Sequence, residues 1–138
     1  MKVKNSVECW LYNKKTDEFL LLQCPETNRH KKYWQPVTGG IELGESAHEA
    51  CIREVWEESG VRLEKGDLNL VIDKIVFNIP EENMELIRTI FIVYTTEKDV
   101  ILSSEHLAFN WELTENVYDK LLWNSNKNTF MKIRSLVQ

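Results

Sequence analysis

Cysteine is scarce in this chain of 138 residues, and its three copies argue against two kinds of cysteine-based site. The number is odd and no Cys-x-x-Cys spacing occurs, so neither a disulfide framework nor a zinc site is expected. Cys9, Cys24 and Cys51 each lie among apolar residues, which predicts buried thiols that act as small hydrophobic side chains. A reducing compartment suits such a chain better than an oxidising one.

The sequence also lacks the features of membrane proteins and of proteins that bind nucleic acids through charge. No run of 18 apolar residues occurs, and the amino terminus, MKVKNSVECW, has no continuous apolar stretch of the kind found in secretion signals. The 17 basic residues are outnumbered by 22 acidic ones, which disfavours membrane-surface and duplex nucleic-acid binding. We therefore expect a cytoplasmic protein. A small anionic substrate is still compatible with this charge, because a bound cation can reverse the local sign.

Length and patterning predict a single domain, residues 1–138, of the α+β class. Apolar and polar residues alternate near the amino terminus, which indicates a half-buried strand with Lys4, Ser6 and Glu8 on its polar side. The polar turn 13–18 joins it to the apolar run 19–24 as a hairpin. The other expected elements are extended segments at 33–40, 68–79 and 86–96, a short strand within 103–113, and helices at 46–59, 114–122 and 127–137.

The helix at 46–59 has clear boundary signals. Ser46 and Glu49 have the spacing of a capping box, and Gly60 stands where a glycine commonly ends a helix. The small side chains of Ala47 and Ala50 are expected beside the acidic residues, where they leave room for another group to approach. The residues expected to pack on a sheet are His48, Cys51, Ile52, Val55, Trp56 and Ser59.

Three glutamates on one side of this helix, Glu54, Glu57 and Glu58, repel one another. The simplest interpretation is a solvated charged face. Arg53 can pair with Glu57 at i,i+4 spacing, but such a pair contributes only about 0.2–0.5 kcal/mol. The sharper interpretation is that divalent cations bind over this face, because carboxylate oxygens suit Mg²⁺ or Mn²⁺.

The spacing of residues 39–61 favours the second interpretation. The stretch reads Gly-x5-Glu-x7-Arg-Glu-Val-x-Glu-Glu-x-Gly-Val and matches every fixed position of the signature of the Nudix hydrolase family. The pattern of flanking strands is similar to that family as well. The resemblance implies an α/β/α sandwich with a mixed central sheet. It also implies an enzyme that cleaves a diphosphate linked to another moiety, with Mg²⁺ or Mn²⁺ as cofactor.

The resemblance assigns roles within the motif. Glu57 and Glu58 correspond to metal-binding glutamates, and Glu54 to a position that binds metal or orients the attacking water. Arg53 looks like the residue that orients a glutamate and the loop backbone. This chemistry needs little covalent work from the protein, because cations neutralise phosphate charge while a carboxylate aims the water.

Two other parts of the motif have less direct roles by the same resemblance. Glu45 is a candidate for indirect contact with metal. The backbone of Gly39 and Gly40 is expected to lend a carbonyl oxygen to a metal. Bound cations and the packed opposite face would together hold the acidic helix in place, so the metal-free helix is expected to be the less stable form.

The later stretch SSEHLAFNWEL, residues 103–113, suggests a fourth carboxylate. A Glu-His followed by Trp resembles diadenosine tetraphosphate hydrolases and the pyrophosphohydrolases of nucleoside or dihydroneopterin triphosphates. In those relatives the glutamate approaches the metal cluster, so Glu105 is the candidate metal ligand or general base; a surface acid is the alternative. His106 is expected to pack under the loop, with orientation of Glu105 as the alternative, and Trp111 is expected in the core.

The segment before the motif supplies candidates for substrate contact. Arg29, Lys31 and Lys32 form the main basic run, which is either a phosphate clamp or a solvated loop. Tyr33 could stack on a base. Trp34 is expected in the core, although an aromatic ring here could also line a base pocket.

Arg88 interrupts an apolar strand, where an arginine usually has a buried anionic partner or a ligand. A structural partner is slightly favoured, and substrate binding is the alternative.

Taken together, these features predict a nucleoside triphosphate pyrophosphohydrolase, with dATP-like purine nucleotides first. Dinucleoside tetraphosphates, dihydroneopterin triphosphate and RNA 5′-triphosphate ends remain alternatives, and the oligomeric state is open. A catalytically silent, nucleotide-sensing Nudix domain is a hypothesis of another class. The complete set of Arg53, Glu54, Glu57 and Glu58 argues against it, because a sensor need not keep all four.

Overall fold

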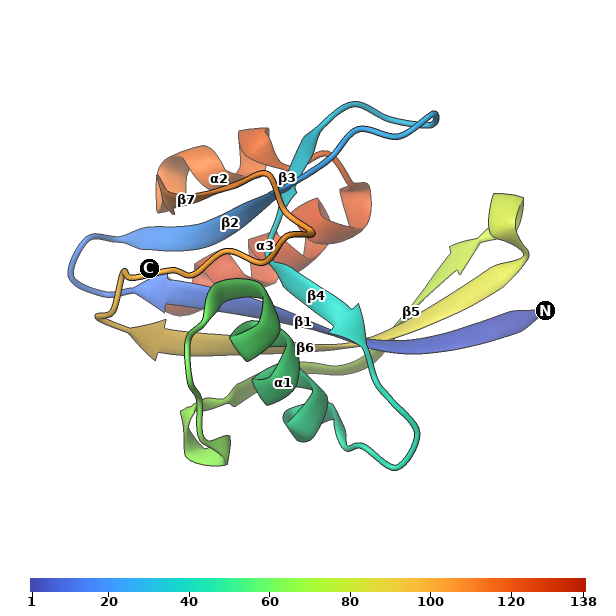
Figure 1. The fold of residues 1–138 in the computed structure, drawn as a ribbon, viewed down its shortest axis with the longest axis horizontal. Coiled ribbons are helices and arrows are strands. Elements are labelled where there is room, and N and C mark those ends of the chain that lie inside the picture. Colours follow the sequence, from blue (N-terminus) through green and yellow to red (C-terminus); the bar gives the residue numbers. More distant parts are fainter.

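The computed structural model describes residues 1–138 as a mixed sheet with helices on both faces (Figure 1). The strands are β1 (Lys2–Asn13), β2 (Glu18–Cys24), β3 (Tyr33–Gln35), β4 (Val37–Gly40), β5 (Asn69–Ile79), β6 (Met84–Thr95) and β7 (Ala108–Leu113). The helices are α1 (Ala47–Ser59), α2 (Thr114–Lys120) and α3 (Asn124–Val137), with short 3₁₀ turns η1 (Lys65–Asp67) and η2 (Pro80–Glu82). The predicted α+β class is confirmed.

The sheet is organised around β1. Its main order is β3-β2-β1-β6-β5, while β4 pairs with β1 and β7 pairs with β2. The pairing of β1 with β6 is parallel and all the other pairings are antiparallel, so the sheet is mixed, as expected. The predicted β1–β2 hairpin is present, but the two strands pair only next to the turn. Beyond that point β1 takes β4 as its partner and β2 takes β3.

Each face of the sheet has its own hydrophobic core. On one face Ala50, Cys51 and Val55 of α1 pack into a cluster with residues of β1, β2 and β6. On the other face α2 and α3 contribute Val117, Phe130 and Ile133. Figure 1 shows α1 separated from α2 and α3 by the strands. This is the predicted α/β/α sandwich.

The expectation that β1 is half-buried is wrong from Ser6 onward. Ser6 is 3% exposed and Glu8 is fully buried, although both lie on the side predicted to face solvent, and Trp10 further along that side is fully buried as well. The physical reason is that β1 is an interior strand with helices over both faces, so both sets of alternating side chains are covered.

The expected packed face of α1 also needs correction. Trp56 is 48% exposed and its ring lies against the guanidinium of Arg62 instead of the sheet. Conversely, Ala50 is fully buried and Glu58 is only 4% exposed, so neither lies on an open face. Glu58 is buried because the loop that contains His106 covers that side of the helix.

Most other expectations from the sequence are confirmed, with small shifts of boundary. The last helix begins at Asn124, three residues before its predicted start, and the turn between β5 and β6 contains η2. Trp34 and Trp111 are partly buried against the two cores, and all three cysteines are free and buried. None of the helices is long and apolar enough to cross a membrane.

Candidate active site

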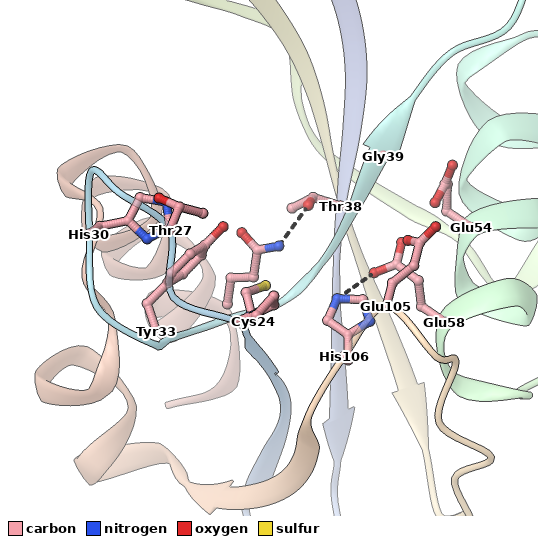
Figure 2. Close-up of a pocket in the computed structure, with 12 residues that line it drawn as sticks. Cys24, Thr27, His30, Tyr33, Thr38, Gly39, Glu54, Glu58, Glu105 and His106 are labelled. Atoms are coloured by element: carbon pink, nitrogen blue, oxygen red, sulfur yellow. Dashed lines mark hydrogen bonds and ion pairs between the residues drawn. The ribbon is translucent and has the colours of Figure 1, made fainter.

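A cavity of about 390 Å³ opens between β2–β4, α1 and the loop before β7 (Figure 2). Glu54, Glu58 and Glu105 gather at one end of it, and His30 and Tyr33 lie at the other. The remaining lining residues are Cys24, Pro25, Thr27, Gln35, Thr38, Gly39 and His106. A larger hollow of about 530 Å³ lies beyond the end of α1 and contains none of the predicted site residues.

Local interactions fix both ends of α1, the helix that carries Glu54, Glu57 and Glu58. The Ser46 hydroxyl accepts a hydrogen bond from the backbone of Glu49 at 3.1 Å, and the Glu49 carboxylate accepts one from the backbone of Ser46 at 2.9 Å. This is the predicted capping box. At the other end Gly60 adopts a φ of 74°, a left-handed conformation that glycine tolerates, and the helix stops there.

Arg53 holds together the acidic groups at the start of the site. Its guanidinium donates to both carboxylate oxygens of Glu45, at 2.8 and 2.9 Å, and to the carbonyl of Gly40 at 2.9 Å. It also contacts Glu54 at 2.7 Å and Glu57 at 3.3 Å. Hydrogen bonding to Arg53 lowers the pKa of Glu45 to about 2. The repulsion within the motif is therefore offset by a network and not by one i,i+4 pair.

Glu58 is the acidic group that Arg53 does not reach. Burial raises its pKa to about 10, and hydrogen bonding to Glu54 together with the negative charges of Glu54 and Glu105 adds to the effect. Its Oε1 atom is buried and has no hydrogen-bond partner. An ionised carboxylate here needs a cation or a further donor.

Gly39 is required by close packing against Glu54. A Cβ atom built at Gly39 would overlap the carboxyl group of Glu54. Any larger residue would therefore displace Glu54 or the end of β4. This contact explains physically why the motif begins with a glycine, which the spacing of the sequence alone does not explain.

The loop before β7 brings Glu105 to the cavity, as predicted. The His106 side chain is 6% exposed and lies under the loop, with its Nε2 3.5 Å from Glu58 Oε1. Burial lowers the pKa of His106, whereas that of Glu58 is raised, so this contact is not an ion pair. Ser103 was not anticipated; its hydroxyl contacts His106 Nδ1 at 3.3 Å. A serine two residues before Glu105 is the local signal that could have indicated it.

The residues present fit a divalent cation. The donors are carboxylate oxygens, and the Oε1 atom of Glu58 is buried with no hydrogen-bond partner, which leaves it free to accept a cation. Glu54 and Glu105 line the same cavity, while the side chain of Glu57 is 54% exposed beside it. In this arrangement of side chains no three acidic, histidine or cysteine groups surround one common point, so metal binding requires rotation of the carboxylates.

The basic residues predicted to clamp phosphate lie beside the cavity and do not line it. Arg29, Lys31 and Lys32 are exposed on the loop between β2 and β3. Arg29 forms an ion pair of 3.1 Å with Glu82 of η2. Tyr33 does line the cavity, where its ring meets those of His30 and Trp123 edge to face.

Arg88 is engaged inside the protein. Its guanidinium donates to the fully buried Glu8 at 3.1 Å and to the Ser6 hydroxyl at 3.2 Å. Trp10 and Asn126 donate to the same carboxylate at 2.8 Å each. Burial raises the pKa of Glu8, which Arg88 counteracts. These contacts favour a structural role for Arg88 over substrate binding. The sequence alone did not identify Glu8 as its partner.

A substitution at Arg88 separates these two roles. Arg88→Met is expected to lower the free energy of unfolding by about 3–5 kcal/mol, because it leaves the Glu8 carboxyl buried without its cation. The KM of the variant that remains folded should stay close to that of wild type. Urea denaturation and steady-state kinetics provide the two measurements.

Arg29→Met is the matched control for the measurement of stability. It removes an exposed arginine whose ion pair contributes at most about 1 kcal/mol. Unchanged stability of Arg88→Met, combined with a large rise in KM, would instead identify Arg88 as a substrate contact.

Other residues of the cavity wall were not singled out from the sequence. Gln35 donates a hydrogen bond of 3.2 Å to the hydroxyl of Thr38, and Thr27 and His30 line the outer part of the cavity. These are ordinary polar residues on a loop and two short strands. Their convergence depends on the splaying of β1 and β2, which no local pattern reveals.

Comparisons with known proteins show the family of this chain. The sequence profile of the NUDIX domain matches residues 2–132. The dihydroneopterin triphosphate diphosphatase of Haemophilus influenzae is 30% identical over an alignment that covers 96% of this chain and 89% of that protein. The asymmetrical bis(5′-nucleosyl)-tetraphosphatase of Sus scrofa is 32% identical, with 70% of this chain and 63% of that protein covered. The structure of a MutT protein from Methanosarcina mazei superposes with a TM-score of 0.77 at 26% identity, covering 98% of this chain and 94% of that one.

Proposed function

The chain belongs to the Nudix family of hydrolases, which act on pyrophosphate bonds, and we propose that this member hydrolyses a nucleoside triphosphate to the monophosphate and pyrophosphate. Purine nucleotides such as dATP are the first candidates. One observation carries the proposal: a single cavity has the carboxyl groups of Glu54, Glu58 and Glu105 at one end and the ring of Tyr33 at the other. Such a cavity suits a phosphate chain joined to a planar base.

Nudix hydrolases generally need a divalent metal, and we propose Mg²⁺ or Mn²⁺ here. Glu54, Glu57, Glu58 and a carbonyl of the Gly39–Gly40 segment would hold it, with Glu105 as a further candidate. The metal neutralises phosphate charge when it is bound. Of these two carbonyls, that of Gly40 accepts a hydrogen bond from Arg53.

The residues of this chain have distinct parts in the proposed reaction. Glu105 or Glu54 accepts a proton from water, the water oxygen forms a bond to phosphorus, and the bridging P–O bond between the α- and β-phosphates breaks, which separates the monophosphate from pyrophosphate. Arg53 keeps Glu54 in place through its 2.7 Å contact. Tyr33 packs against the base, and Lys31 and Lys32 remain candidates for the distal phosphates.

The proposal predicts a strict dependence on metal. EDTA should abolish release of pyrophosphate, and added Mg²⁺ should restore it, because the candidate ligands are carboxylate oxygens. The assay uses a panel of dATP, other nucleoside triphosphates, diadenosine tetraphosphate, dihydroneopterin triphosphate and 5′-triphosphorylated RNA. Nucleotide products are measured together with pyrophosphate, because cleavage of diadenosine tetraphosphate releases two nucleotides and no free pyrophosphate. Full turnover in chelator would contradict the metal assignment. Binding of a nucleotide without turnover of any panel member would favour the nucleotide-sensing alternative.

Dihydroneopterin triphosphate is the second candidate substrate. The Haemophilus influenzae relative named for that activity aligns with nearly the whole chain, which supports it. Dihydroneopterin triphosphate also joins a flat ring system to a triphosphate chain and suits the same cavity. A kcat/KM for dihydroneopterin triphosphate well above that for every nucleotide would move it to first place.

A further inference from the structure

The loop Ser103–His106 connects the backbone of Glu105 with the carboxyl group of Glu58 through one chain of polar contacts. The backbone N–H of Glu105 donates to the Ser103 hydroxyl at 3.3 Å. That hydroxyl contacts His106 Nδ1 at 3.3 Å, and His106 Nε2 lies 3.5 Å from Glu58 Oε1. Figure 2 shows the His106 ring between the loop and the carboxyl groups that come from α1.

The donors and acceptors along this chain favour one tautomer of the imidazole, because an ionised Glu58 carboxylate can only accept a hydrogen bond. The Ser103 oxygen already accepts from Glu105, so its own hydrogen is free for the Nδ1 atom of His106. A ring that accepts at Nδ1 carries its hydrogen at Nε2. That hydrogen faces Glu58 Oε1, the buried oxygen that has no hydrogen-bond partner.

Packing alone does not account for His106. Its side chain is buried, as a hydrophobic residue in this place would be, but both ring nitrogens face polar atoms. The 3.5 Å separation between His106 Nε2 and Glu58 Oε1 is longer than a good hydrogen bond, so the two atoms are close but not well hydrogen-bonded in this structure. Contacts of catalytic groups are commonly long without ligands and shorten once the site is loaded.

We propose that His106 and Ser103 are positioning residues, in which the Nε2–H of His106 orients the Glu58 carboxylate for cation binding and Ser103 sets both the His106 tautomer and the backbone of Glu105. The inference rests on the proposed metal-dependent function. Partners of this kind, which touch a ligand but not the metal, typically contribute about 10- to 100-fold to metal affinity.

Two substitutions of His106 distinguish positioning from packing. His106→Phe keeps the volume and shape of the ring and removes the donor. His106→Gln can place an amide N–H near the position of Nε2. Mn²⁺ binding to the whole protein without substrate is measured by electron paramagnetic resonance, and the Mg²⁺ concentration for half-maximal activity is measured separately. Circular dichroism confirms that each variant is folded.

The expected result is a loss of Mn²⁺ affinity of about 10- to 100-fold for His106→Phe, and a value near wild type for His106→Gln. The Mg²⁺ requirement should follow the same order, with kcat largely recovered at high Mg²⁺. Ser103→Ala should weaken Mn²⁺ binding, whereas Ser104→Ala, at the exposed neighbouring position, should not.

Other outcomes overturn the inference. Equal Mn²⁺ affinity of His106→Phe and wild type would show that His106 only fills space. Equal losses in the Phe and Gln variants would also contradict a donor role. If wild type itself neither bound Mn²⁺ nor hydrolysed any substrate, the proposed function would fail together with the inference. If wild type binds Mn²⁺ and hydrolyses a substrate, but the variants of His106 and Ser103 bind Mn²⁺ equally well, the inference fails and the proposed function stands.

Discussion

Glu105→Gln is expected to lower kcat by roughly 10²- to 10⁴-fold with little change in KM, the range for loss of a general base. The substitution keeps the size of the side chain and removes its ability to accept a proton. Glu105 lies in the loop before β7 and reaches the cavity of Glu54 and Glu58 only through folding. Steady-state kinetics at saturating Mg²⁺ with the best substrate of the panel measures the effect.

The response to Mg²⁺ distinguishes a base from a metal ligand at this position. If Glu105 is a secondary ligand, raising the Mg²⁺ concentration should recover much of the lost activity; if it is the base, it should not. Glu97→Gln is a suitable control, because Glu97 is exposed earlier in the same connection between β6 and β7. If Glu105→Gln has the same kcat as this control, Glu105 is a surface acid without a catalytic role.

Glu58→Gln is expected to lower kcat by at least about 10²-fold and to raise the melting temperature of the metal-free protein. The loss of rate follows from removing a group that stabilises transition-state charge, directly or through metal. The gain in stability follows from burial: Glu58 is 4% exposed, and its carboxyl group faces the negative charges of Glu54 and Glu105. Near neutral pH a carboxyl group with a pKa of about 10 must take up a proton on folding, which lowers stability, whereas an amide is already neutral and can donate to Glu54.

Glu57→Gln is the matched variant for this prediction. It should lower kcat on the same scale, but the melting temperature without metal should change little, because the side chain is 54% exposed. Differential scanning calorimetry in EDTA, with and without excess Mg²⁺, compares the pair. Near-normal kcat in both variants would show that the metal-binding face of α1 is misassigned. A lower metal-free melting temperature for Glu58→Gln would contradict the account of its burial.

Much of the candidate site could be predicted because its signals are local. The motif spans residues 39–61, and helix caps such as Ser46 and Gly60 act within a few residues of themselves. Hairpin formation between β1 and β2 is equally local, because a short polar turn brings adjacent strands together. Glu105 could be proposed only because its surroundings resemble those of a known family.

Errors in the prediction share a physical cause. Alternation of polar and apolar residues in β1 indicated one buried side, yet Glu8 is as buried as Trp10. The wheel of α1 placed Glu58 outward, where the loop containing His106 covers it. In both cases the chemistry of a side chain was taken to reveal its exposure, whereas exposure depends on which distant segments pack over it.

The sequence by itself determined the family motif carried by α1, the ends of that helix and most of the strands, because these depend on residues close together along the chain. Only the tertiary structure decided which groups became partners across long separations. Arg88 reaches Glu8 from 80 positions away, and His106 reaches Glu58 from a different element. The packing of the layers decides how many faces of a strand are covered and which groups surround a buried carboxylate. The periodicity of one segment does not contain this information.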